Sequence, residues 1–422
     1  MTVVSYEGIN NARPSKWKTA SGEWHSLAGY AMAAAKDLRD YGVKPLAENW
    51  TDEVGRAAAG KFEKLANQFE VAYDILLAVN MVADSMTTAI ETAHSTMREA
   101  QQLADQYGLT IGVDGTITGP PVHNRTEAEE LGPYRSQVQD LIDQAVEQVT
   151  TADKLAAAEF TKLANQTGLT DPDKALNELQ THASHVQMEM LAADIPVDQD
   201  PTTVRQWWGG LTAQQRKDMM LAEPVLIANL NGIPEDVRTD LRGNGKYDRV
   251  KLVQYALDNW DKGDPTDFGN NCTNFVSNAL HAAGMKEKTS FWEGTTDDDS
   301  WMIGNPSGID WVDKKLAYSD NWTAAENNQN FMLRHGGQEV SRAEVKPGDI
   351  LYYEQAGPND SIEKGTTHHA AIVTAVMPDG EIKYTQHTDS YQNVSLEGRI
   401  NATEKHEGAQ NIRIVRPNPD WY

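Results

Sequence analysis

The 422-residue sequence has one cysteine, few basic residues relative to its acidic ones, and no long apolar run. A single cysteine excludes an intramolecular disulfide framework. No stretch is apolar over the length that a bilayer requires, so we expect no transmembrane segment. The start of the chain, Met1 to Glu7, has neither the basic residues nor the apolar core of a Sec signal peptide. We therefore expect that any export uses another route.

Basic residues are scarce: 37 Lys and Arg stand against 62 Asp and Glu, for a formal net charge of −25. A field of this sign opposes binding to nucleic acid and to anionic lipid. The composition therefore argues against a nuclease, and we expect no nucleic-acid partner. The acidity is mainly explained by its contribution to solubility.

The one cysteine, Cys272, directly precedes a helical pattern. Apolar residues recur at helical spacing at Phe275, Val276, Ala279 and Leu280, and Gly284 is a natural helix stop. Unpaired N–H groups and the positive end of a helix dipole favour a thiolate. We therefore interpret Cys272 as a nucleophile, with Asn270 or Asn271 capping the helix. The alternative is a free cysteine that is buried and inert.

Two later stretches favour the nucleophile interpretation. Lys346–Tyr353 reads as a turn that leads into a strand, and His368–Val376 reads as a strand that opens with histidine. A third strand is expected at Ile382–Asp389, after a Pro-Asp-Gly turn. Cysteine on a helix, histidine on a strand and a polar residue on the next strand is the order of papain-like thiol hydrolases.

The motifs NNCTNFVSNALHAAG, KPGDILYY, HHAAIVTAV and YTQHTD, in this order, resemble the bacterial putative-amidase family, whose papain-like domains are related to NlpC-type peptidases and CHAP amidases. The resemblance covers residues 244–422. It implies that Cys272 attacks an amide carbonyl and that His369 is its base. His387 fits the position of the residue that orients His369, and Asp389 is the rival. It also implies an α+β papain-like fold with no metal or organic cofactor.

The tetrahedral oxyanion of such a reaction needs hydrogen-bond donors. The backbone N–H of Cys272, at the start of its helix, is the expected first donor. A second is expected upstream, between Asp267 and Asn271. The sequence leaves open which residue supplies it.

The N-terminal part shows a narrow apolar seam with spacings of three and four, which is typical of paired helices. The first twenty residues show no such pattern, and we expect them to be poorly structured. The seam comprises Trp24, Leu27, Ala31, Ala34, Leu38 and Tyr41, and then Leu65, Phe69, Ala72, Leu76, Val79, Ala83, Met86, Ile90, Ala93 and Met97. Gly42 and Pro45 are expected to end the first helix, and the short connection carries Trp50. Residues 1–115 therefore predict an antiparallel helical hairpin.

Over residues 20–110 this pattern resembles the WxG-type substrates of the type VII secretion system of Gram-positive bacteria, which are helical hairpins with a tryptophan at the turn. Here Thr51 and Asp52 follow Trp50, and the nearest glycine is Gly55. The resemblance implies secretion without a Sec signal and a helical secretion partner or chaperone. The alternative is a hairpin that only packs on its neighbours.

Two further regions precede the amidase-like one. Residues 116–203 hold helical patterns and turn-rich linkers, with a helix start at Asp171. Residues 204–243 form a Trp-rich segment, which we interpret as a docking element because it has no converging acid–base set. Its paired Trp207 and Trp208 suit core packing better than a sugar platform.

A long insertion, Ser290–Trp322, lies between the Cys272 helix and the strands. Long loops beside an active site often shape a substrate groove. The insertion holds several tryptophans, namely Trp292, Trp301, Trp311 and Trp322. Asp297, Asp298 and Asp299 lack Cys or His at ligand spacing, so we expect a solvated face rather than a metal site.

The sequence thus predicts a multidomain protein with an all-α N-terminal half and a C-terminal α+β papain-like domain. We expect an exported cysteine amidase or peptidase toxin that cleaves peptidoglycan peptides and has an immunity protein. One alternative is a thiol enzyme that deamidates, cleaves or transfers to an intracellular protein. The other is a non-enzymatic surface interaction protein.

Overall fold

The computed structural model divides into two compact units, which we call the helical unit (Met1–Arg216) and the mixed unit (Lys217–Tyr422). The structure describes residues 4–121, 125–166, 168–243, 245–263, 268–289, 294–304, 312 and 316–422. Within the described residues, no helix is both long and apolar enough to cross a membrane. The boundary between the units falls inside the predicted docking segment, residues 204–243.

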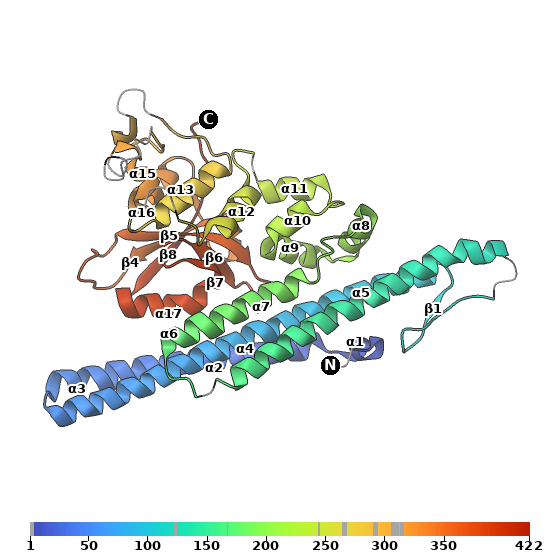
Figure 1. Cartoon of the computed structure of the whole chain (residues 1–422), viewed down its shortest axis with the longest axis horizontal. Coiled ribbons are helices and arrows are strands. Elements are labelled where there is room, and N and C mark those ends of the chain that lie inside the picture. Colours follow the sequence, from blue (N-terminus) through green and yellow to red (C-terminus); the bar gives the residue numbers. More distant parts are fainter. Residues whose placement is uncertain are drawn as a thin grey trace. The chain divides into compact units, whose positions relative to one another are not determined.

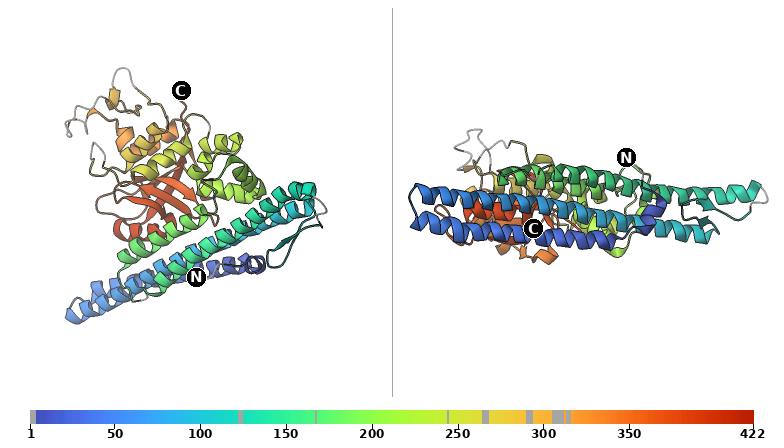
Figure 2. Two further views of the ribbon diagram at one scale, coloured as in Figure 1. Left: turned by 45° about the vertical axis from the view of Figure 1, so that its right-hand side comes forward. Right: turned by 90° about the horizontal axis from the view of Figure 1, so that it is seen from below.

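The helical unit is built from long helices that run side by side (Figures 1 and 2). In chain order they are α1 (Tyr6–Asn11), α2 (Pro14–Asp37), a π-helical segment (Leu38–Val43), α3 (Lys44–Asn49), α4 (Glu53–Gln106), α5 (Arg125–Ala164), α6 (Pro172–Lys174), a second π-helical segment (Ala175–Gln180) and α7 (Thr181–Ala192). A two-stranded hairpin, β1 (Thr110–Ile111) with β2 (Ile117–Thr118), links α4 to α5. The prediction that the first twenty residues lack structure is wrong, because α1 and the start of α2 occupy them.

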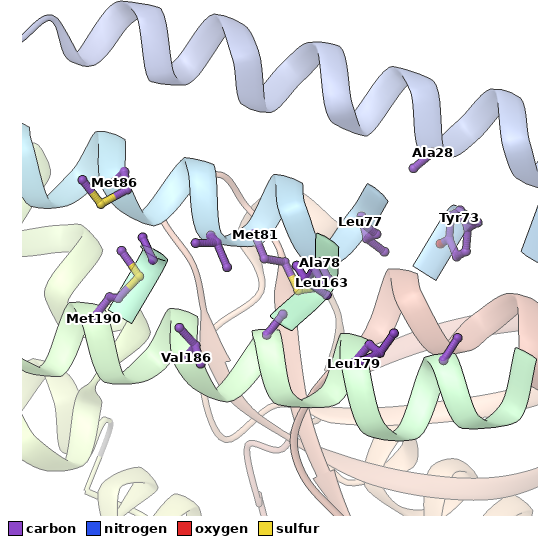
Figure 3. Close-up of a cluster of buried hydrophobic side chains, with 14 of the residues drawn as sticks. Ala28, Tyr73, Leu77, Ala78, Met81, Met86, Leu163, Leu179, Val186 and Met190 are labelled. Atoms are coloured by element: carbon purple, nitrogen blue, oxygen red, sulfur yellow. The ribbon is translucent and has the colours of Figure 1, made fainter. Parts of the chain in front are cut away.

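The centre of the helical unit is α4, which packs against α2, α5 and α7. Figure 3 shows Leu77, Met81 and Met86 of α4 facing side chains of the neighbouring helices. The predicted seam is only partly buried, since Trp24, Leu27 and Leu65 are exposed. A two-helix hairpin buries one stripe of each helix, whereas a helix with three neighbours is buried on several sides. This explains why Tyr73 and Val82, outside the seam, are also in the core.

The connection between α2 and α4 remains helical beyond Gly42, which differs from the prediction. Pro45 lies in the first turn of α3, which follows the π-helical segment directly. Trp50 follows α3, and Asp52 caps α4 by accepting a 2.9 Å hydrogen bond from the N–H of Gly55. A Cβ at Gly55 would overlap the Trp50 carbonyl, so this glycine permits the close packing of the turn.

The later helix starts follow the sequence. Asp171 accepts from the N–H groups of Asp173 and Lys174, which confirms it as a helix cap. The docking segment forms α8 (Pro201–Gly210), α9 (Ala213–Ala222), α10 (Pro224–Asn229) and α11 (Glu235–Arg242). Trp207 and Trp208 are both buried, with ring centroids 5.8 Å apart, so they pack in a core as expected.

The mixed unit contains a six-stranded antiparallel sheet. Its strand order is β3-β8-β4-β5-β6-β7. The strands are β3 (Gln338–Glu339), β4 (Ile350–Gln355), β5 (Thr367–Val376), β6 (Ile382–Gln386), β7 (Tyr391–Ser395) and β8 (Gln410–Arg416). β5 is buried continuously from Ala370 because helices cover both faces of the sheet.

One face of this sheet packs against α12 (Arg249–Asn259), α13 (Cys272–Ala282), α15 (Asp320–Thr323) and α16 (Ala325–Arg334). The other face packs against α17 (Leu396–Glu407), as Figure 1 shows. The layers place the start of α13 beside the start of β5, and α13 contacts β5 directly. The mixed helix-and-sheet character expected for the C-terminal half is therefore present.

The turn before β4 is fixed by a buried carboxylate. Asp349 is fully buried and accepts hydrogen bonds from the Lys346 N–H, from Arg249 at 3.1 Å, and from Arg416 at 2.8 and 2.9 Å. Gly348 takes a φ of +86°, which suits glycine. These contacts tie α12 and β8 to the centre of the sheet.

Candidate active site

Cys272 is the first residue of α13 and is 2% exposed. The first hydrogen bond of the helix runs from the Phe275 N–H to the Asn271 carbonyl, which leaves the N–H groups before Phe275 without helical acceptors. Asn271 occupies the cap position, but its side chain does not cap the helix. Its Oδ1 instead accepts a 2.9 Å hydrogen bond from Asn274 Nδ2. Cys272 thus lies where the sequence placed it.

The His369 imidazole, near the start of β5, interacts directly with the Cys272 thiol. Burial alone would raise the thiol pKa, but the positive imidazole and hydrogen bonds from His369, Thr273 and the Ala370 N–H lower that pKa to about 7. Burial would lower the His369 pKa, but the charge and hydrogen bond of Cys272, the hydrogen bond to Gln386 and the charge of Glu407 together raise it. Each side chain therefore favours the charged form of the other.

The other nitrogen of His369 is held by Gln386, the last residue of β6. His369 Nε2 and Gln386 Oε1 are 2.9 Å apart. Gln386 Nε2 donates to the carbonyls of Thr388 at 2.9 Å and Asp389 at 3.0 Å. These two acceptors require the NH₂ group on their side, so the amide oxygen must face His369. His369 Nε2 is then the donor, and its Nδ1 is left for the thiol.

The two third-residue candidates from the sequence do not contact His369 in this arrangement. β6 ends at Gln386, so His387 and Asp389 lie in the loop after it rather than on the expected strand. His387 Nε2 bonds the Lys262 carbonyl at 2.8 Å, and the ring packs 5.7 Å from Phe275. The Asp389 side chain is exposed, and only its carbonyl reaches Gln386.

Sequence reasoning missed Gln386 because it favoured ionisable residues as partners of a histidine. A usable signal was the position of the glutamine at the end of a strand whose other residues are buried. The antiparallel register pairs Ile372 with Thr385. Gln386, the next residue of β6, therefore lies closer than Thr385 to the end of β5 that carries His369.

The neighbouring His368 is separated from the site by an irregularity in the sheet. Tyr353 pairs with His369 and Glu354 pairs with Thr367, so the β4–β5 ladder skips His368. A bulge of this kind redirects side chains. His368 bonds Gln410 at 2.8 Å and lies 3.8 Å from a Glu407 oxygen. Of the two adjacent histidines, the structure brings only His369 to Cys272.

A buried polar network supports the Cys272 helix from behind. Asn274 accepts a 2.9 Å hydrogen bond from Trp322 Nε1, and Ser277 donates one of 2.9 Å to the Trp322 carbonyl. Trp301 Nε1 and Asn328 also donate to Ser277. Satisfied networks of this kind rigidify a core and fix side-chain geometry.

The insertion contributes core rather than a groove where the structure describes it. Trp301 and Trp322 are fully buried, and their rings stack with centroids 4.4 Å apart. Trp292 and Trp311 lie outside the described residues. Asp298 and Asp299 are exposed, as expected for a solvated face, and Asp299 also pairs with Lys288 and His335.

The structure limits which of the expected oxyanion donors has a free N–H group. The Asn271 N–H is taken by Thr388 Oγ1 at 2.7 Å, so it is not a free donor. Asp267, at the other end of the predicted range, lies outside the described residues. The Cys272 N–H precedes the first helical hydrogen bond, and its role as an oxyanion donor stays a prediction.

Comparisons with known proteins fit this geometry. Residues 246–410 match the family model described as "Putative amidase domain". The uncharacterized protein YhbB of Bacillus subtilis is 31% identical over 164 residues, which is 34% of this chain and 46% of that protein. The uncharacterized protein Rv2079 of Mycobacterium tuberculosis is 29% identical over 225 residues, which is 43% of this chain and 33% of that protein.

The chain thus spans less than half the length of these curated relatives. No solved structure matches it. The family match covers the segment that holds Cys272, His369 and Gln386. The match over residues 246–410 therefore supports a putative amidase domain in this part of the chain, and with it hydrolase activity on amides.

Proposed function

We propose that the mixed unit is a papain-like cysteine amidase that cleaves a peptide bond through a thioacyl intermediate. The observation that carries the proposal is that the two ring nitrogens of His369 face different partners. Nε2 donates to Gln386, so Nδ1 is free to accept a proton from Cys272. A nucleophile, a base and a group that orients the base form the constellation of covalent amide hydrolysis.

In the first half of the reaction the Cys272 thiolate attacks the amide carbonyl carbon and forms a C–S bond. The carbonyl π electrons move to oxygen, and the Cys272 N–H at the start of α13 stabilises the oxyanion. As the intermediate collapses, the C–N bond breaks. The protonated His369 gives its proton to the leaving amine.

In the second half, water attacks the thioester. His369, now neutral, takes the proton of the water while the C–O bond forms. The second oxyanion collapses, the C–S bond breaks, and a carboxylic acid and the Cys272 thiolate are released. Throughout both halves Gln386 keeps the same hydrogen bond to Nε2, so the ring does not have to turn.

As the substrate we propose the cross-linking or stem peptides of peptidoglycan. The helical unit would serve export by the type VII route, with a helical partner or chaperone. The support is the α2–α3–α4 hairpin with Trp50 at its turn and Gly55 packed against that tryptophan. An exported enzyme of this kind would act as an antibacterial toxin and would require an immunity protein in the producing cell.

The proposal is tested by incubating purified peptidoglycan with the full chain and analysing the soluble products by mass spectrometry. Cys272→Ala, which removes only the sulfur, is the matched control. The proposal expects new peptide fragments with the wild-type chain alone, and their masses identify the cleaved bond. Equal products from both proteins would contradict a thiol mechanism. No products from either would instead favour an intracellular protein substrate for the same dyad.

A further inference from the structure

The four-residue loop after β6, residues 387–390, touches both halves of the proposed catalytic pair. On one side its carbonyls bind Gln386, which holds the base His369. On the other side its side chains reach the chain segment that leads into Cys272. One short loop therefore bridges the base and the nucleophile.

Thr388 and Asp389 in this loop both have left-handed backbones, with φ values of +69° and +49°. This region is uncommon for residues other than glycine, and a β-branched threonine rarely occupies it. Such conformations are strained and persist where the surroundings impose them. Here the conformation accompanies two successive carbonyls that accept from one amide group, Gln386 Nε2.

The Thr388 hydroxyl makes the second connection. Its Oγ1 accepts a 2.7 Å hydrogen bond from the N–H of Asn271, the residue immediately before Cys272. The next residue back in the loop, His387, packs against Phe275 on α13 and bonds the Lys262 carbonyl. Thr388 is thus bonded through its carbonyl to Gln386 and through its hydroxyl to the start of the nucleophile helix.

We propose that Thr388 is a positioning residue that holds Cys272 and His369 in register, through its hydroxyl on Asn271 and its carbonyl on Gln386. This inference rests on the proposed function, since it assumes that the pair acts as nucleophile and base. A displacement of about 1 Å between reacting groups can cost about 100-fold in rate. A link that runs through Asn271 to Cys272 and through Gln386 to His369 limits such displacement.

The experiment measures the rate of Cys272 alkylation by iodoacetamide between pH 5 and pH 10 in the full chain, together with the melting temperature. Three variants separate the parts of the claim. Thr388→Val removes the hydroxyl but keeps the shape and the β-branch, and Thr388→Ser keeps the hydroxyl. Thr388→Gly removes the hydroxyl while relieving the left-handed strain.

In Thr388→Val and Thr388→Gly we expect the midpoint of the pH profile to rise by about one unit, the scale on which a neighbouring charge moves a pKa. Thr388→Ser should keep the wild-type midpoint. Thr388→Gly should melt at or above the temperature of Thr388→Val. A shift of the alkylation midpoint can then be separated from a loss of stability. If Thr388→Val does not fold, Thr388→Gly carries the test.

A wild-type midpoint in the hydroxyl-free variants would overturn the role of Thr388 and leave the proposed function intact. A midpoint in the wild-type chain no lower than that of an ordinary thiol, about 8.5, would contradict the activated nucleophile itself. The failure of the inference and the failure of the proposed function are thus distinguishable.

Discussion

His369 Nε2 and Gln386 Oε1 are joined by a 2.9 Å hydrogen bond, and the NH₂ group of the same amide is held by two backbone carbonyls. A neutral amide in this position fixes the imidazole tautomer without adding a charge. The Cys272 thiolate raises the pKa of the His369 ring, and the ring lowers the pKa of the thiol in return. This arrangement determines what each substitution at the site should do.

Gln386→Ala should reduce amide hydrolysis by about 100-fold, because His369 loses the contact that orients its ring. The release of soluble peptides from peptidoglycan measures this. Asp389→Asn is the matched control, since it keeps the carbonyl that Gln386 uses and changes only an exposed side chain. It should retain activity within about twofold. A loss in Asp389→Asn as large as that in Gln386→Ala would restore Asp389 as the orienting residue.

Gln386→Glu should be more damaging to stability than its chemical similarity suggests. It replaces the NH₂ group, with its two N–H donors, by one oxygen that faces the Thr388 and Asp389 carbonyls. A buried group left without partners costs about 1–3 kcal/mol, and more when charged. Urea unfolding should show this loss at pH 7. The variant should recover part of it near pH 4, where the new carboxyl can protonate and donate. Unchanged stability at both pH values would show that the amide is not held as described.

Asp349→Asn should destabilise the mixed unit by about 3 kcal/mol, because removing one partner leaves buried charge unpaired. Arg249 and Arg416 both depend on this carboxylate. Chemical denaturation of the full chain measures the effect. Glu339→Gln, which breaks an exposed pair with Arg413, should cost less than about 1 kcal/mol. Equal losses in the two variants would contradict the central role of Asp349.

The helical unit should be less stable at neutral pH than its packing suggests. Asp194 is 2% exposed and neither of its carboxyl oxygens has a hydrogen-bond partner, so burial raises its pKa well above the usual value. Because the folded pKa is the higher one, the stabilising contribution is complete below the unfolded pKa of about 4 and is lost as pH rises through the folded pKa.

Asp194→Asn should therefore melt at a higher temperature than wild type at pH 7 and at nearly the same temperature at pH 4. The expected gain at pH 7 is about 1 kcal/mol or more. Circular dichroism of the full chain at the two pH values measures it. A gain that is the same at both pH values would show that the titration of Asp194 is not its cause.

The sequence was sufficient to locate Cys272 and His369, because both lie at the start of an element with a clear apolar period. It was insufficient to identify Gln386, the residue that orients His369. Gln386 was passed over because the end of β6 could not be placed within three residues, and an amide carries no chemical signature of its own. The loop that holds it depends on left-handed residues, Thr388 and Asp389, that no local pattern favours.

In the helical unit, too, the sequence pattern predicted only part of the packing. The period of α2 and α4 predicted paired helices, and the structure contains that pair. The pattern did not reveal that α5 and α7 also pack on α4, because a seam records only the most apolar stripe. The exposure of Trp24 and Leu27 follows from this rearrangement of neighbours. Tertiary packing, rather than local propensity, decided which face became the core.

The central claim is that His369 activates Cys272, and the pH profile of Cys272 alkylation in wild type and His369→Ala tests it most directly. Burial of the thiol slows alkylation at every pH, so the midpoint rather than the rate is the readout. The account predicts a wild-type midpoint of about 7. His369→Ala should move it above about 8.5, the value of an ordinary thiol, because burial is then opposed only by the hydrogen bonds from Thr273 and the Ala370 N–H. The same midpoint in both proteins would contradict the account.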